Sequence, residues 1–258
     1  MTSIKRSDSV RDRTLANLTS PAAGESRGQA VLVPTGAVEQ HGPHLPVGTD
    51  TLIAAAIARQ VASQMEGVLV AEPIPYGCSW HHLGFPGTVS LGVTTFVAVV
   101  VDVCRSLRQQ GLTPIVLNGH AGNRAALDVA VTELAVAGYR CAALTYFDLL
   151  REDARDLIPE ADSATGHACA LETSLSLFLW PGAVDSDAIP SGGTPSSWPD
   201  PHMFARKEVS IIRAFDEINP SGVIGEPSLA TAELGERLFD AAVRRCIDAV
   251  GRARRELG

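Results

Sequence analysis

Short aliphatic runs alternate along the chain with longer stretches in which hydrophobic residues recur every three or four positions. The short runs are typical of buried strands, and the longer stretches have the period of a helix with one buried face. Their alternation predicts an α/β fold, in which helices connect the strands of one sheet. The pattern predicts strands at 30–34, 68–71, 88–91, 114–117 and 140–146, and helices at 51–65, 94–110, 123–137, 173–179 and 231–254.

Two segments depart from this alternation. Residues 1–28 carry basic side chains among Ser, Thr and Asp, without the apolar stretch of a signal peptide, and predict an N-terminal tail with at most one short helix. Residues 181–201 are rich in Pro, Gly and Ser, which break regular elements, and a loop this long is usually a lid, an interface arm or mobile. The length of 258 residues and the lack of an internal repeat predict one domain, 29–258.

Composition and charge narrow the function classes. Hydrophobic residues make up 45% of the chain and the net charge is −8, so the chain is neither disordered overall nor built with the basic surface of a nucleic-acid or anionic-membrane binder. No apolar run approaches the roughly 18 residues of a membrane span. The five cysteines are widely spaced and set mostly among aliphatic residues, as in a reducing compartment. We expect a cytoplasmic protein with a small-molecule or protein partner.

Candidate chemistry begins directly after the first predicted strand. Glu39 and His41 stand two residues apart, and the turn forced by Gly42 and Pro43 can bring Asp50 back beside them. These side chains suit zinc, manganese or iron, and a carboxylate can bridge two ions. Asp50 also stands where a helix is expected to begin, so an N-cap role is the alternative.

Three further segments bring polar side chains close to buried elements. His120, in NGHAGN, follows a buried strand, and ligands bind at the carboxyl ends of strands in open α/β sheets. His167 and Glu172 lie in GHACALETS, where the alternatives are a structural histidine and a helix-favouring glutamate. Segment 76–88 combines polar and aromatic side chains and can line a pocket, although neighbouring His81 and His82 should diverge, so that at most one faces any given ion. Together these residues favour a metal-assisted hydrolase.

Five motifs resemble, in order, those of the creatininase family of metal-dependent amidohydrolases, over nearly the whole chain from residue 30. The family includes creatinine amidohydrolase, formylamino-pyrimidine deformylases and the peptidase that trims the mycofactocin precursor. The resemblance implies a three-layer αβα sandwich with a mainly parallel sheet, two divalent metal ions (Zn, Mn or Fe) and a homo-oligomer, frequently a hexamer. The motifs are GAVEQHGPHLPVGTD, YGCSWHHLGFPGTVSL, NGHAGN, GHACALETS and GVIGEPSLATAELGERL.

The resemblance also assigns roles to residues. Asp50 matches a metal ligand that bridges the two ions, and Glu172 matches either a further ligand or a residue that supports one. His167 matches a histidine implicated in proton transfer and substrate contact. The remaining matches are the metal ligands Glu39, His41 and His120, and the pocket-lining, substrate-binding Ser79 and His82.

Some positions depart from the creatinine amidohydrolase pattern. That enzyme has NGHYEN in the third motif, whereas this chain has Ala121 and Gly122 in place of the Tyr and the Glu, and Phe147 stands near the position of a Trp. The leading hypothesis is therefore hydrolysis of another non-standard C–N bond, in a cyclic amide or a formamide, by a hydroxide held between two ions. The alternatives are a mycofactocin-type peptidase that removes a short C-terminal peptide, with Trp198 and the loop 181–201 holding the peptide, and a non-catalytic small-molecule-binding protein.

Overall fold

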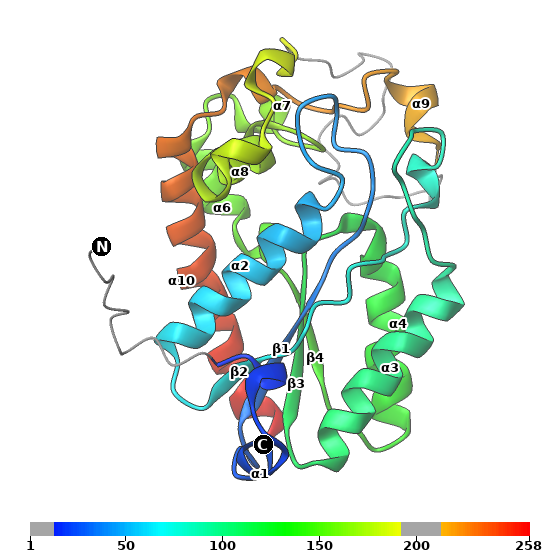
Figure 1. Ribbon diagram of the computed structural model, residues 1–258, viewed down its shortest axis with the longest axis vertical. Helices are drawn as coiled ribbons and strands as arrows, with labels where there is room; N and C mark the ends of the chain where they lie inside the picture. The colour runs from blue at the N-terminus through cyan, green and yellow to red at the C-terminus, as the bar shows by residue number, and fades with distance from the viewer. Residues whose placement is uncertain (1–12, 192–212) are drawn as a thin grey trace, which may run out of the picture.

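The computed structural model describes residues 13–191 and 213–258, and its centre is a four-stranded parallel sheet (Figure 1). The strand order β2-β1-β3-β4 places the first and third strands at the middle. Thr35 pairs with Asn118 and Asn118 with Thr145, so three strands end at one level. The strands are β1 (Ala30–Thr35), β2 (Val68–Val70), β3 (Thr113–Asn118) and β4 (Ala142–Thr145).

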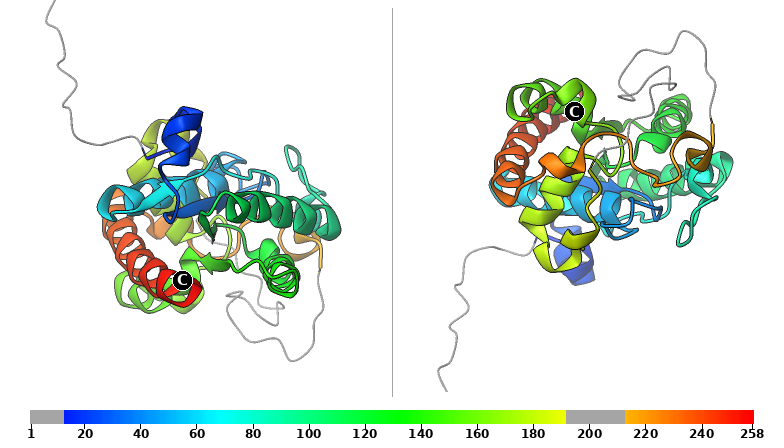
Figure 2. Two further views of the ribbon diagram at one scale, coloured as in Figure 1. Left: turned by 90° about the horizontal axis from the view of Figure 1, so that it is seen from below. Right: turned by 90° about the horizontal axis from the view of Figure 1, so that it is seen from above.

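Helices cover both faces of the sheet, which gives three layers (Figure 2). Leu32 of β1 points into a core shared with α2 and α10, whereas its neighbours Val31 and Val33 point into a second core shared with α3 and α4. This division follows from the alternation of side chains along a strand. The covering helices are α2 (Thr49–Gln64) and α10 (Ala232–Leu257) on one face, and α3 (Val93–Gln109) and α4 (Arg124–Val136) on the other.

Shorter helices gather mainly beyond the carboxyl ends of the strands, at the top of Figure 1, while the C-terminus lies at the opposite end. Helix α8 packs against α10 so closely that a Cβ atom at Gly235 would lie 1.9 Å from the carbonyl oxygen of Ser174. The remaining α-helices are α1 (Ser20–Gly24), α5 (Tyr146–Leu149), α6 (Arg151–Leu157), α7 (Ala161–Ala164), α8 (Ala170–Leu179) and α9 (Phe215–Ile218). Short 3-10 helices cover Leu15–Asn17, Trp80–His82, Ala121–Asn123, Pro181–Ala183, Ser186–Ala188 and Pro227–Leu229.

Most expected elements are present, with a few differences. The strand expected at 88–91 is absent, because only Val89 pairs, in an isolated bridge with Val38. The strand expected at 140–146 is shorter, since Tyr146 begins α5. No described helix is long and apolar enough to cross a membrane.

The segments set apart at the sequence level are described only in part. Thr14 pairs with Val70 of the edge strand β2, and Leu15 and Leu18 pack against the core, so these residues contact the sheet layer. The boundary at residue 28 stays a prediction. Of the loop 181–201, residues 192–201, including Trp198, lie outside the described residues.

Candidate metal centre

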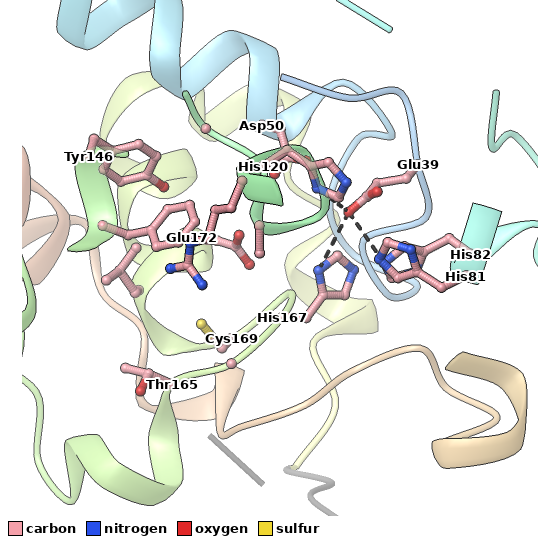
Figure 3. A pocket seen from close by; sticks show the side chains of 16 residues that line it. Glu39, Asp50, His81, His82, His120, Tyr146, Thr165, His167, Cys169 and Glu172 are labelled. Atoms are coloured by element: carbon pink, nitrogen blue, oxygen red, sulfur yellow. Dashed lines mark ion pairs between the residues drawn. The ribbon is translucent and has the colours of Figure 1, made fainter. Parts of the chain in front are cut away.

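A pocket opens at the carboxyl ends of β1 and β3, and its floor is made of histidine and carboxylate side chains (Figure 3). The space between its walls, with the open mouth included, is about 580 Å³. Residues from distant segments meet there: the loop after β1, the 3-10 helix Trp80–His82, the loop after β3 and the segment that leads into α8. The predicted site residues that line it are Glu39, Asp50, His82, His120, His167 and Glu172, and His41 lies directly beneath.

One group of ligand-type atoms surrounds His41. Its Nε2 lies 3.1 Å from Oδ1 of Asp50 and 3.9 Å from Oε1 of Glu172, and all three side chains are buried. Asp50 belongs to the first turn of α2, but the cap residue is Gly48 and no side chain caps the helix. The alternative N-cap role for Asp50 is therefore wrong, and its carboxylate faces the pocket.

A second group lies beside the first and shares Asp50 with it. Nδ1 of His120 lies 3.1 Å from Oδ2 of Asp50 and 3.3 Å from Oε1 of Glu39. The two oxygens of Asp50 thus face two different histidines, which is the placement that a bridging carboxylate needs.

The proton positions on the two histidines follow from their outer contacts. Nδ1 of His41 lies 3.1 Å from the carbonyl oxygen of Glu39, and Nε2 of His120 lies 3.1 Å from that of Cys78. Because a carbonyl oxygen can only accept, these nitrogens carry the protons in the neutral rings. The opposite nitrogens then present lone pairs to the carboxylates, which is how metal-binding histidines are held by their surroundings.

The buried carboxylates of this site lack partners that a bound cation would supply. Both carboxylate oxygens of Glu39 and Oδ2 of Asp50 are buried and have no hydrogen-bond partner among the described residues. Unpaired buried carboxylate oxygens are costly, and lone pairs that face one another repel. Three ligand atoms of His41, Asp50 and Glu172 lie within 4.8 Å of one another, close enough to share one ion.

The titration of the side chains shows the same excess of negative charge. Burial lowers the pKa of His41, but Asp50, with Glu172 and Glu39, overcomes this effect and raises it to about 10. Burial likewise works against protonation of His120, yet Glu39 and Asp50 raise its pKa well above the ordinary value. For Glu172, burial dominates and raises the pKa to about 7. In the absence of an ion, protons therefore compensate the carboxylates.

Glu172 is held by an unusual backbone conformation. Ala168 has φ of 50°, a left-handed conformation that side chains other than glycine rarely adopt, and its N–H donates to Oε2 of Glu172 at 2.6 Å. This bond fixes one carboxylate oxygen and leaves Oε1 directed at His41.

His167 lies on the other side of Glu39. Its Nε2 donates to the carbonyl oxygen of Gln40 at 2.8 Å, and its Nδ1 lies 3.8 Å from Oε1 of Glu39. Burial, reinforced by the charge of His41, lowers the pKa of His167 well below its ordinary value. The ring is therefore neutral, with its unprotonated nitrogen toward the pocket.

His81 and His82 both approach Glu39, which corrects the expectation that they diverge. Nε2 of His82 lies 3.4 Å from Oε1 of Glu39, and His81 joins Glu39 and His120 in a group close enough to hold an ion. The reason is the 3-10 helix Trp80–His82, which turns the two rings to one side with centroids 4.4 Å apart. In the sequence, what points to His81 as a site residue is its position next to His82 in the motif YGCSWHHLGFPGTVSL.

The tautomer of His82 is set by Gln40, a residue that sequence reasoning missed. Oε1 of Gln40 accepts from the N–H of Gly42, and its Nε2 donates to the carbonyl oxygen of Gly222, both at 2.9 Å. The same amide nitrogen lies 2.9 Å from Nδ1 of His82, which must accept. His82 therefore presents an Nε2–H to Glu39, unlike His41, His120 and His167.

Ser79 does not line the pocket. It is fully buried, and its hydroxyl lies 3.3 Å from Nε2 of His120, behind the ring. Gly122 packs just as closely there, because a Cβ atom at this position would lie 2.4 Å from both Nε2 of His120 and the carbonyl oxygen of Cys78. The glutamate of the NGHYEN pattern has no room at this position.

Comparison with known proteins agrees with this geometry. The family model described as creatininase, creatinine amidohydrolase, matches residues 16–250. The chain is 37% identical over 233 residues to the mycofactocin precursor peptide peptidase of Mycolicibacterium smegmatis, covering 86% of this chain and 84% of that protein. It is 30% identical over 251 residues to the creatinine amidohydrolase of Pseudomonas putida, covering 89% and 90%.

Solved structures show the same fold. One titled as a manganese creatininase superposes with a TM-score of 0.77 at 28% identity, covering 93% of this chain and 98% of the other. A mutant creatininase of the Zn-Zn type gives a TM-score of 0.76 at 28% identity, covering 93% and 97%. The chain belongs to the creatininase family of hydrolases.

Proposed function

We propose that the protein is a metal-dependent hydrolase that cleaves an amide C–N bond in a small polar substrate. One observation carries the proposal: at one pocket, two histidines present lone pairs to buried carboxylates, of which Glu39 and Asp50 have oxygens without hydrogen-bond partners among the described residues. The solved relatives with manganese and zinc in their titles support a divalent ion here.

The residues fit two ions. His41, Asp50 and Glu172 would hold one, and Glu39, Asp50 and His120 the other, with Asp50 common to both. Zn, Mn and Fe all accept this mixture of imidazole and carboxylate ligands. When bound, divalent ions of this kind polarise a carbonyl group and lower the pKa of water enough to give a nucleophile near neutral pH.

The chain's own residues would move the protons. The unprotonated Nδ1 of His167 faces the pocket and can take a proton from the attacking water, because the other ring nitrogen is held by the carbonyl oxygen of Gln40. Protonated His167 can then deliver that proton to the leaving nitrogen. His82 presents an N–H in the same pocket and would donate a hydrogen bond there rather than bind an ion.

Two substrate classes have support. The relatives named as mycofactocin precursor peptide peptidases, one at 37% identity, favour removal of a short C-terminal peptide. The creatinine amidohydrolase relative at 30% identity favours a cyclic amide, and a formamide is the third amide type that the resemblance suggests. Creatinine itself fits poorly, since Gly122 stands in place of an acidic residue and cannot carry a side chain.

The test combines metal analysis with a substrate panel. We expect protein purified without added metal to contain stoichiometric Zn, Mn or Fe, and to hydrolyse at least one member of a panel of lactams, cyclic ureides, formamides and short peptides. His41→Ala and Asp50→Asn should lower metal content and reduce turnover at least 100-fold. Asp102→Asn, on an exposed part of α3, is the matched control. Full metal content and turnover in the two site variants would exclude the proposal, and a metal-free protein that binds small molecules without turnover would favour the binding-protein alternative.

Assembly and location stay predictions from the resemblance and the composition. We infer a homo-oligomer, with a hexamer as the form expected from the family, and a cytoplasmic location.

A further inference from the structure

One cationic side chain lines the same pocket as the carboxylates. Arg124 is the first residue of α4, four positions after His120, and it is the sole Lys or Arg among the described residues that line the pocket. The walls between the floor and Arg124 include the aromatic rings of Tyr146 and Phe147. The pocket therefore has an anionic, metal-binding end, an apolar wall and a cationic group.

The guanidinium of Arg124 is held in place by two contacts. One Nη atom is paired with the carboxylate of Asp148, and Cζ lies 4.8 Å from the centre of the Phe147 ring. A guanidinium stacked on an aromatic face keeps its N–H edges available for in-plane hydrogen bonds. Arg124 is thus fixed in direction before any ligand arrives.

The hydrogen bonding of the Arg124 guanidinium is incomplete. Nε of Arg124 is buried and has no partner among the described residues. A buried N–H of a charged group without an acceptor is destabilising. The edge formed by Nε and an Nη is one of the guanidinium edges that can bind both oxygens of a carboxylate at once.

A purely structural role for the ion pair between Arg124 and Asp148 explains fewer of these observations than ligand binding does. The Arg124 and Asp148 side chains are 32% and 47% exposed, and ion pairs in such settings contribute little to stability. Such a pair accounts for neither the unpartnered Nε nor the position of the guanidinium in the pocket wall.

We propose that Arg124 binds a carboxylate group of the substrate and so determines which amides are cleaved, an inference that rests on the function proposed above. The substrate class is an amide that carries a free carboxylate a few bonds from the scissile bond, such as an acyl amino acid or the C-terminal end of a peptide. Arg124 attracts that carboxylate to its own side of the pocket. The amide carbonyl is thereby directed to the metal-binding end.

The test measures binding apart from turnover. The probes are 3-phenylpropionate and the uncharged 3-phenylpropan-1-ol, neither of which has an amide to hydrolyse, titrated into the full chain as purified and again after chelation. We expect wild-type protein to bind the carboxylate at least ten-fold more tightly, and Arg124→Gln to reduce this preference to less than two-fold. Arg105→Gln, which removes the arginine of an exposed Arg–Asp pair on α3, should leave it unchanged.

A second variant separates recognition from a structural role. Asp148→Asn removes the same ion pair but leaves Arg124 with its full charge. Carboxylate binding should stay equal or become tighter, whereas a structural role predicts that Arg124→Gln and Asp148→Asn behave alike. The inference is overturned if Arg124→Gln and Asp148→Asn lose carboxylate binding to the same extent. It is also overturned if wild-type protein does not prefer the carboxylate over the alcohol.

Activity is then measured on acetyl-Ala-Ala and its C-terminal carboxamide. We expect kcat/KM to favour the free acid in wild-type protein and to lose that preference in Arg124→Gln. Carboxylate binding without hydrolysis of any amide would contradict the proposed function and leave the role of Arg124 standing. Hydrolysis of an amide with no preference for a free carboxylate, in binding or in kcat/KM, would support the proposed function and contradict the role of Arg124.

Discussion

Three histidines in the pocket share one arrangement at the level of single atoms. In His41, His120 and His167, one ring nitrogen donates to a backbone carbonyl and the other faces a carboxylate. The sequence motif predicts the residue types, because imidazole and carboxylate groups follow strands in a spacing suited to ions. It does not predict which nitrogen carries the proton, since the carbonyls that decide this belong to loops whose path is set by tertiary packing.

Metal binding should release protons. Without an ion the pKa of His41 is about 10, raised by its carboxylates against the effect of burial, so the ring is protonated at pH 7.5 and must lose its proton to become a ligand. We expect metal affinity to increase with pH from 6 to 8. Calorimetric titration of chelated protein with Zn²⁺ in buffers of different ionisation enthalpy measures the number of protons released. A value near zero would contradict the protonation of His41 in the metal-free protein.

Gly122 marks a position where one added carbon matters. A methyl group there meets both the ring of His120 and the carbonyl oxygen of Cys78 at 2.4 Å, so the histidine or the backbone must move. We expect Gly122→Ala to lower the free energy of unfolding by about 1–3 kcal/mol and to weaken metal binding roughly 10- to 100-fold. Gly182→Ala, where nothing lies within 4 Å, is the control for the same change. Denaturant unfolding and metal titration check both values.

At the scale of elements, the sequence predicts the long ones well and the short ones poorly. The sheet strands β1 and β3 and the helices α2, α3, α4 and α10 lie within a few residues of their expected positions, because each has a continuous apolar run or a repeated apolar face. Helices α6, α7 and α9 were not predicted, since none is longer than seven residues and so none shows a full helical period. The single bridge at Val89 was read as a strand because β-branched residues surround it.

Asn118 joins three strand ends beneath the site. Its Oδ1 accepts from the hydroxyl of Thr35 and the N–H of His120, and its Nδ2 donates to the carbonyl oxygen of His120 and the hydroxyl of Thr145. The side chain is fully buried, so each of these partners depends on it. The in-register ends of β1, β3 and β4 therefore fix the loop that carries His120.

Replacing this amide should loosen both the sheet and the site. We expect Asn118→Ala to reduce the free energy of unfolding by about 2 kcal/mol or more, because several buried donors and acceptors lose their partner. Metal affinity should fall as well, since the His120 loop is no longer held. Gln60→Ala, an exposed position on α2, should change neither quantity. An Asn118→Ala protein that binds metal normally would show that the loop keeps its shape by other means.

At the scale of the whole molecule, the candidate ligands come from residues 39 to 172 and meet only in the folded chain. An ion that binds this set stabilises the native state, by about 2.7 kcal/mol at a free concentration 100 times its Kd. For a chain of this size that corresponds to a rise in Tm of roughly 5–10 °C. We expect Zn²⁺ or Mn²⁺ to raise the Tm of chelated protein by this amount in a thermal scan, and Asp50→Asn to abolish the shift. An unchanged Tm in wild-type protein would argue against a native metal centre.

The close crossing of α8 and α10 also bears on the order in which the site can form. Because Gly235 lets α10 touch the backbone of α8 at Ser174, we expect Glu172 to reach its final place only when α10, which follows α8 in the sequence, has been made and packed. The segments with Glu39, His41 and His120 are synthesised well before that point. During synthesis the chain therefore carries an incomplete set of ligands, and we expect metal to be retained firmly only after α10 has folded.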